Sequence, residues 1–238
     1  MPFHKSPTPA PAERILATAD KLFYTQGIRA VGVDTIAAEA GVSKRTLYNH
    51  YPSKDALIAA YLTARFRPLP PSDAPAREQI LGAFDRLERI FASSNFRGCP
   101  FVNAVSELGD PRHAACRIAI QFKEERRLWF RALLERLGVK DPDALATQLQ
   151  ILAEGALATA LVRGDPAVAR AARAAAEVLL EAAGIHAAIA RKRPERTGAP
   201  NGSIGHRMQD LVIGGDTAPT DLASNKARLR GYGRTRRR

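Results

Sequence analysis

The 238-residue sequence has little cysteine, few aromatic residues and no long apolar run. Its two cysteines, Cys99 and Cys116, are too few for a disulfide framework and lack the spacing of a structural zinc site, so we expect a reducing compartment and no bound metal. No apolar run approaches the ~18 residues that cross a bilayer, and the first residues lack the apolar stretch of a signal peptide. The sequence therefore predicts a cytoplasmic protein without a membrane partner.

Basic residues are in excess, but they are unevenly distributed. The formal net charge is +12, and residues 191–238 hold 12 of the 36 Lys and Arg but only 4 of the 24 Asp and Glu, so +8 of the charge lies there. Residues 186–238 lose the helical apolar period and are predicted to form a disordered basic tail. Such a tail either adds non-specific affinity for DNA or is an appendage without a role. Bulk charge is therefore weak support for sequence-specific binding.

Apolar residues recur at three- and four-residue steps, which is typical of amphipathic helices. Aromatic residues make up only 6% of the chain and alanine is abundant, which also favours helix over sheet. The fold class is therefore predicted to be all-α. Periodicity, caps, prolines and glycines place the helices at residues 12–26, from Asp34 or Thr35 to 40, 44–51, from the cap Ser53 through 61, 76–94, from 111 to 137, 142–163 and 166–183.

Prolines divide the chain into parts. Four of them in the first eleven residues predict a mobile arm at 1–11, and four between Pro68 and Pro75 interrupt the helices. We expect an N-terminal three-helix helix-turn-helix domain at 12–67 and a larger C-terminal helical bundle domain at 76–185, about nine helices, followed by the tail.

The segment Ala40-Gly41-Val42-Ser43 has the composition of a helix-turn-helix turn: a small residue, a glycine, an apolar plug and a helix cap. The predicted inner face is formed by Ile36, Ala37, Ala40, Val42 and Leu47. The remaining residues of the second short helix then face outward and are rich in hydrogen-bond donors: Lys44, Arg45, Thr46, Tyr48, Asn49 and His50. This arrangement predicts a surface that binds double-stranded DNA.

The donors divide into two chemical groups. Lys44 and Arg45 can donate to guanine O6 and N7, and Asn49 can bond adenine N6 and N7, so these three are candidates for contacts with base edges. Phosphates accept from hydroxyl, imidazole and ammonium groups. The candidates for phosphate contacts are Thr35, Ser43, Tyr48, His50 and Lys54. The alternative is that these charges only keep one face of a helix pair in water.

The run DTIAAEAGVSKRTLYNHYPSKDAL at 34–57, preceded by the helix at 12–27, closely resembles the N-terminal module of the TetR family. The resemblance implies a dimeric repressor, without enzymatic activity or cofactor, that binds a pseudo-palindromic operator and releases it when an unknown small-molecule effector binds the second domain. It also implies DNA contacts by Thr35, Lys44, Tyr48, His50 and Lys54. Arg45 stands where the family often has glycine, so no operator sequence is implied.

The second domain carries two further predictions. The resemblance implies that the helices at 142–163 and 166–183 form the homodimer interface, although their small and apolar residues are also compatible with an internal core. An effector pocket would be lined by middle-helix side chains, but aromatic residues at helical spacing are more often core. The candidate ligand-binding residues are Phe84, Phe91, Phe101, Asn103, Phe122 and Trp129, with Phe130 and Gln121 as further candidates.

Cys99 precedes Pro100, which can open a helix whose N-terminus would stabilise a thiolate. Two interpretations follow: a buried structural cysteine, or a redox sensor that responds to electrophiles, with Cys116 as its resolving partner. Two other protein classes also remain: a thiol enzyme using Cys99 with His113, and a sequence-tolerant DNA-coating protein. No nucleotide-binding loop, metal cluster or oriented triad supports the enzyme, so no catalytic residue is predicted.

Overall fold

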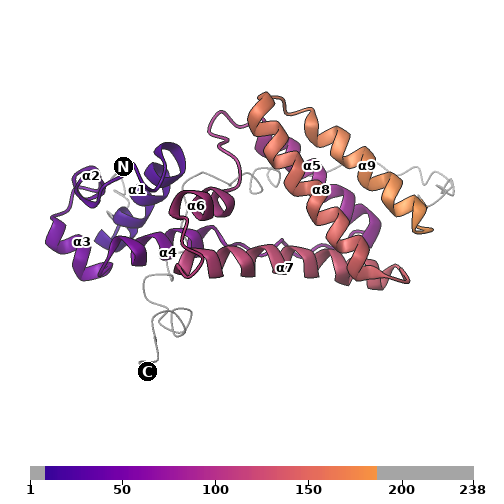
Figure 1. The fold of residues 1–238 in the computed structure, drawn as a ribbon, viewed down its shortest axis with the longest axis horizontal. Coiled ribbons are helices and arrows are strands. Elements are labelled where there is room, and N and C mark those ends of the chain that lie inside the picture. Colours follow the sequence, from indigo (N-terminus) through magenta and orange to yellow (C-terminus); the bar gives the residue numbers. More distant parts are fainter. Residues whose placement is uncertain (1–8, 187–238) are drawn as a thin grey trace, which may run out of the picture. The chain divides into compact units, whose positions relative to one another are not determined.

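The computed structural model describes residues 9–186, and these contain nine α-helices and no strand (Figure 1). The all-α prediction is confirmed. The predicted arm at 1–11 and basic tail at 186–238 lie almost entirely outside the described residues. The helices are α1 (Pro11–Gln26), α2 (Val33–Glu39), α3 (Lys44–His50), α4 (Lys54–Arg65), α5 (Ala76–Phe91), α6 (Pro100–Leu108), α7 (Ala114–Arg136), α8 (Pro142–Arg163) and α9 (Val168–Ala182).

The described chain packs as two compact units. The first contains the described residues up to 70 together with 97–125, and the second contains 71–96 and 126–186. Helix α6 and the first half of α7 therefore group with the N-terminal helices, although sequence reasoning assigned them to the second domain. Residues 66–75, where the prolines interrupt the predicted helices, contain no helix.

In the first unit, α1 contacts α2, α3 and α4. Its buried side lies at the three- and four-residue spacing expected from the sequence, and it packs Phe23 edge-on against Tyr61 of α4. Arg65 of α4 donates two hydrogen bonds to Asp20 of α1, at 2.5 and 2.9 Å, and its guanidinium lies 4.2 Å from the centroid of the Tyr24 ring. Burial raises the pKa of Tyr61, which keeps its hydroxyl neutral.

Several predicted helix ends are wrong by a few residues. Helix α2 begins at Val33 after Gly32, without a side-chain cap, so neither Asp34 nor Thr35 has the capping role proposed for it. The other predicted starts differ because a proline only permits a helix to begin, and the loop geometry decides where it does. Helix α5 ends at Phe91 and not at 94, α7 begins at Ala114 and not after 111, and α9 begins at Val168 and not at 166.

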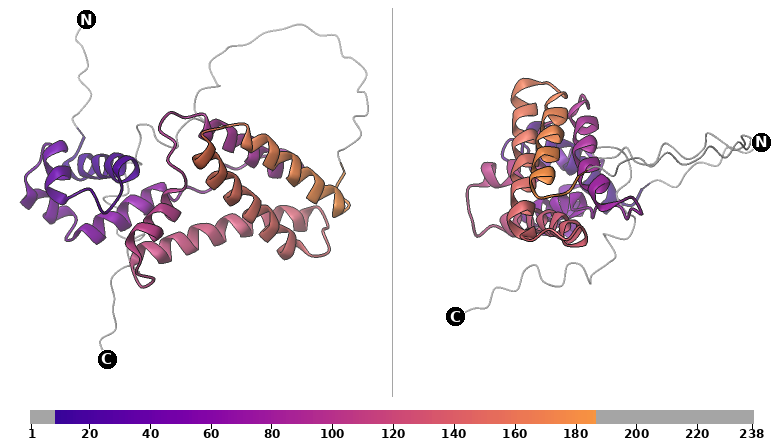
Figure 2. Two further views of the ribbon diagram at one scale, coloured as in Figure 1. Left: turned by 45° about the horizontal axis from the view of Figure 1, so that its top comes forward. Right: turned by 90° about the vertical axis from the view of Figure 1, so that its right-hand side faces the viewer.

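In the second unit, α5, α8 and α9 contact one another (Figure 2). Their core holds Ile80, Phe84, Leu149, Ala176 and Leu180, each 1% exposed or less. Helix α8 begins at Pro142 and ends at Arg163 before Gly164, as the sequence predicts. Small residues on the buried sides of α8 and α9 allow close packing of the two helices.

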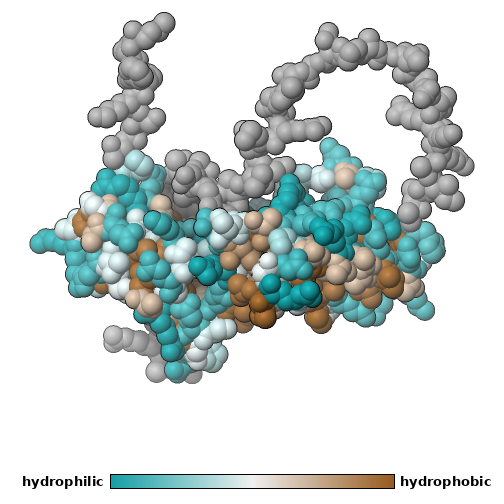
Figure 3. All heavy atoms as spheres, turned by 90° about the horizontal axis from the view of Figure 1, so that it is seen from above, coloured by the Kyte–Doolittle hydropathy of each residue, from teal (hydrophilic) through white to brown (hydrophobic). Residues whose placement is uncertain are grey.

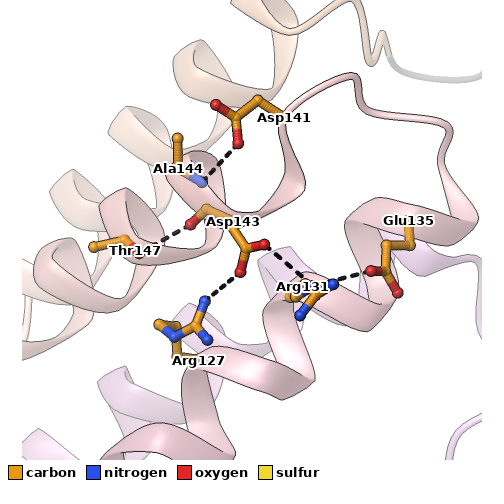
Figure 4. A network of polar contacts seen from close by, with 7 residues as sticks. All are labelled: Arg127, Arg131, Glu135, Asp141, Asp143, Ala144 and Thr147. Carbon is orange, nitrogen blue, oxygen red and sulfur yellow. Dashed lines mark hydrogen bonds and ion pairs between the residues drawn. The ribbon is translucent and has the colours of Figure 1, made fainter.

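A polar network fixes the start of α8 against α7 (Figure 4). Asp141 caps α8 by accepting the Ala144 amide at 3.1 Å. Asp143 accepts a 2.6 Å hydrogen bond from Arg127 and lies 3.5 Å from Arg131. The hydrogen bond from Arg127 lowers the pKa of the Asp143 carboxyl.

Helix α8 is also apolar on nearly all sides. Although Glu154 and scattered polar residues interrupt its apolar run, its length and composition would suffice to cross a membrane. Core helices of water-soluble proteins share this property.

Candidate nucleic-acid interface

The helix-turn-helix in the structure is α2, the turn at 40–43 and α3. Gly41 has a φ of +64°, a left-handed conformation that disfavours side chains with a Cβ, and the Val42 amide donates to the Ala37 carbonyl at 3.0 Å. Ser43 caps α3 by accepting the Thr46 amide at 3.0 Å, as the sequence predicts. The turn therefore takes only four residues, and α3 begins directly after it.

The inner face of the two helices is apolar and closed. Ile36, Ala37, Ala40 and Leu47 are buried, and Val42 is half-buried, in agreement with the predicted set. Because these residues fix α2 and α3 on α1, the opposite face is held in place without contributing to the core.

Two side chains missed by sequence reasoning anchor the turn and α3. Arg14 of α1 donates to the carbonyls of Ala40, at 3.2 Å, and Gly41, at 3.4 Å. The Tyr51 hydroxyl donates to the Ala12 carbonyl at 3.2 Å. The sequence gives little signal for either role, because the acceptors are backbone carbonyls, which every residue has.

The predicted DNA-binding residues lie close together on α2, α3 and the start of α4. Most of their side chains are exposed, and the Tyr48 ring is 39% exposed. Two differ: Thr46 is half-buried with its hydroxyl 2.8 Å from that of Ser43, and Lys54 is half-buried. The exposed members are Thr35, Ser43, Lys44, Arg45, Tyr48, Asn49 and His50.

The first residue of α3 forms an ion pair with α2. Lys44 Nζ lies 2.9 Å from Asp34 Oδ1 and 3.1 Å from Oδ2, and both side chains are exposed. The hydrogen bond to the carboxylate raises the pKa of Lys44. Sequence reasoning assigned Asp34 a capping role and missed this contact, which depends on the turn bringing two residues ten positions apart together.

The candidate ligand-binding residues are divided between the two units. In the first, Phe101 and Phe122 stack with centroids 3.9 Å apart, Phe66 meets both edge-on, and Asn103 donates to the Arg97 carbonyl at 2.7 Å. The second unit contains the other candidates: Phe84, Phe91, Trp129 and Phe130. Trp129 packs edge-on against Phe130, with centroids 5.0 Å apart.

The two cysteines are buried, free thiols with different partners. Lys123 Nζ donates to Cys99 Sγ at 3.3 Å, and Cys116 Sγ donates to the Asp110 carbonyl at 3.2 Å. His113, the partner considered for a thiol enzyme, accepts the Ala115 amide through Nδ1 at 3.0 Å, and its Nε2 lies 3.4 Å from Asp55. The structure therefore gives Cys99 a lysine neighbour.

The helix-turn-helix matches a known family. Residues 15–61 match the model of bacterial regulatory proteins of the tetR family. The HTH-type transcriptional regulator YjdC of Escherichia coli is 28% identical over 176 residues, which cover 71% of this chain and 92% of that protein.

Solved structures extend the likeness to both units. A TetR-type transcriptional regulator from Streptomyces avermitilis is 36% identical, with a TM-score of 0.67 over 75% of this chain and all of that one. The TetR-family regulator SCO4454 from Streptomyces coelicolor is 33% identical, with a TM-score of 0.65 over 73% of this chain and 96% of that one. The helix-turn-helix, the second helical unit and these likenesses agree: the chain belongs to the TetR family of DNA-binding transcriptional regulators.

Proposed function

We propose that this protein is a cytoplasmic, dimeric repressor that binds a pseudo-palindromic operator through α3 and releases it when a small molecule binds. The observation that carries the proposal is the row of exposed donors on α3, held by a closed apolar inner face. A two-helix unit of this kind places its second helix in the major groove, and two copies related by a twofold axis read two half-sites.

The donors take two roles in this proposal. Lys44, Arg45 and Asn49 contact base edges. Phosphate contacts hold the helix in register and come from Thr35, Ser43, Tyr48, His50 and Lys54, while Thr46 supports the cap beside them.

A gel-shift and footprinting series on DNA from the region upstream of the protein's own gene tests the proposal. We expect one protected palindrome, and a loss of about tenfold or more in affinity for Lys44→Ala or Tyr48→Ala. Lys21→Ala, which removes an exposed lysine from α1, is the matched control and should retain most of the affinity. Equal affinity for unrelated duplexes at physiological salt would instead indicate a sequence-tolerant coating protein.

The dimer is supported by an exposed apolar stripe on α8 and α9. On α8 the stripe contains Ile151, 65% exposed, and Val162, 86% exposed, with Gly155 and Ala158 between them; on α9 it contains Val178, 64% exposed. Figure 3 shows brown, hydrophobic residues on the surface. Apolar stripes on two neighbouring helices favour isologous pairing with the same stripe of a second copy.

Sedimentation of Val162→Glu tests the dimer. A carboxylate placed within an apolar interface should shift the protein to monomer and weaken operator binding with it. Ile120→Glu alters an exposed isoleucine of α7 outside the stripe and should remain dimeric. A dimeric Val162→Glu protein would reject this interface.

The effector is proposed to be a small molecule that binds within one unit: either beside Phe84, Phe91 and Trp129, or beside Phe101 and Phe122 with Asn103 as a polar anchor. The chain contains one tryptophan, Trp129, so its fluorescence reports changes in that environment alone. A compound that releases the operator and alters this fluorescence supports the proposal. A compound that releases the operator but leaves the Trp129 fluorescence unchanged, both in the wild type and in Phe130→Leu, would show that the effector binds elsewhere.

A second signal is proposed at Cys99, because Lys123 lies 3.3 Å from its sulfur. A neighbouring ammonium stabilises negative charge on sulfur as it attacks an electrophile. With an α,β-unsaturated carbonyl compound, the S–H adds across the C=C bond: sulfur bonds the β-carbon, and the proton is delivered to the α-carbon. N-ethylmaleimide should release DNA from the wild type and from Cys116→Ser, but not from Cys99→Ser; release from Cys99→Ser would refute the sensor.

A further inference from the structure

Lys44, the first residue of α3, already forms an ion pair in the free protein. Asp34 lies in the first turn of α2, and its two oxygens lie 2.9 and 3.1 Å from Lys44 Nζ. Both groups are on the face that carries the exposed donors, where side-chain exposure is 53% for Lys44 and 75% for Asp34. A carboxylate therefore sits within the surface proposed to contact DNA.

This carboxylate opposes non-specific binding. Affinity for any DNA comes mainly from cations that replace the counterions of the phosphates. Asp34 offsets the charge of Lys44 and leaves Arg45 and Lys54 as the uncompensated cations of α3 and of the start of α4. An exposed surface pair adds little to stability, so its effect on charge outweighs its effect on the fold.

The hydrogen-bonding groups of Lys44 and Asp34 are complementary to those of one particular base pair. In the major groove, G·C offers guanine N7 and O6 as acceptors and cytosine N4 as a donor. An ammonium group can donate to N7 and O6, while a carboxylate accepts from N4. The Nζ–Oδ1 separation of 2.9 Å equals the usual hydrogen-bond spacing of about 2.9 Å, which also separates O6 from N4 in the base pair.

An A·T pair does not fit the same couple. In A·T the adenine N6 amino donor lies between two acceptors, adenine N7 and thymine O4. The N6 group therefore lies near the position where guanine O6 would meet the ammonium in a G·C pair. The ammonium would then face a donor, and the carboxylate would face thymine O4, an acceptor.

We propose that Asp34 is a specificity-determining residue: with Lys44 it forms a donor–acceptor couple that reads one G·C base pair in each half-site and disfavours DNA that lacks it. The inference rests on the proposed function, because it requires α3 to enter the major groove.

Selection of binding sites from randomised DNA duplexes tests the couple, using full-length wild type, Asp34→Ala and Glu39→Ala. Glu39 is an exposed acidic residue at the other end of α2, so its removal changes the net charge equally. The quantity compared is the ratio of affinity for the selected duplex to affinity for an unrelated duplex. For Asp34→Ala we expect this ratio to fall about tenfold, with loss of a G·C preference at one position of each half-site.

The remaining results overturn one hypothesis or the other. A ratio within about threefold of the wild type, or an equal fall in Glu39→Ala, overturns the role of Asp34 and leaves the repressor proposal intact. Failure of the wild type to enrich any palindrome overturns the proposed function and, with it, this inference. In a Lys44→Ala background, Asp34→Ala should change the ratio by less than about twofold, because the couple is already broken; a full effect there would show that Asp34 acts alone.

Discussion

Two helix pairs in this molecule expose opposite chemistry. The α2–α3 pair turns its apolar residues inward and exposes hydroxyl, amide, imidazole and cationic groups, whereas α8 and α9 also expose Ile151, Val162 and Val178. Donors suit a hydrated polyanion, and an apolar stripe suits a surface of its own kind. The difference fits the two proposed roles, in which one pair meets DNA and the other meets a second copy of the chain.

The largest effect is expected when a buried side chain of α3 is truncated. Leu47→Ala removes a side chain that is 0% exposed and should lower the free energy of unfolding by about 2–5 kcal/mol. Operator affinity should fall as well, although no donor is touched. Urea denaturation measures the loss, and Ile120→Ala, which truncates an exposed side chain, should change it by no more than about 0.5 kcal/mol. Similar losses in both variants would mean that α3 is not held by its inner face.

A second prediction contrasts the ion pairs of the two units. Arg65→Met breaks a pair in which the arginine is only 11% exposed, and it should cost about 3 kcal/mol because Asp20 is left without its partner. Arg131→Met breaks two exposed pairs, with Glu135 and Asp143, and should cost less than about 1 kcal/mol for each. Thermal denaturation of both variants makes the comparison, and equal costs would contradict it.

Helix caps separate stability from DNA binding. Ser43→Ala and Asp141→Ala each remove an N-cap and should each cost about 1 kcal/mol. Only Ser43→Ala should weaken operator binding, because Ser43 also lies at the start of α3. Gel shifts carried out well below both melting temperatures test this, and an equal loss of affinity in Asp141→Ala would argue against a local role for Ser43.

The smallest effect concerns pH. The folded-state pKa of Asp143 lies below its unfolded value of about 3.9, so its contribution to stability is present above that pH and is lost as pH falls through the folded pKa. Wild type should therefore be more stable than Asp143→Asn at pH 6, and the two should converge in strong acid. Denaturation at a series of pH values measures the difference, and a constant gap would assign the effect to something other than ionisation.

The sequence predicted the helix-turn-helix well because its signals are local. The buried set at Ile36, Ala37, Ala40 and Leu47, the glycine of the turn and the cap at Ser43 each follow from spacing and from the chemistry of single residues. The confirmed family resemblance rests on the same segment.

What the sequence could not predict depends on contacts between distant segments. Asp34 has the chemistry of a cap, and only the turn reveals that it pairs with Lys44. Helix α8 is apolar all round, so periodicity could not separate its buried Leu149 from its exposed Ile151. The aromatic candidates could not be assigned to the two units, because residues 97–125 pack with the N-terminal helices.

The way Arg14 holds the turn and Tyr51 holds the end of α3 bears on how such proteins acquire new operators. Arg14 bonds to the carbonyls of Ala40 and Gly41, and Tyr51 bonds to that of Ala12. Main-chain acceptors survive almost any substitution, so the outward residues of α3 can be exchanged while the attachment is kept. The helices that hold α3 thus do not depend on the identity of its outward residues. Grafting a relative's outward residues at 44–50 onto this chain should give it the relative's DNA preference without redesign of α1.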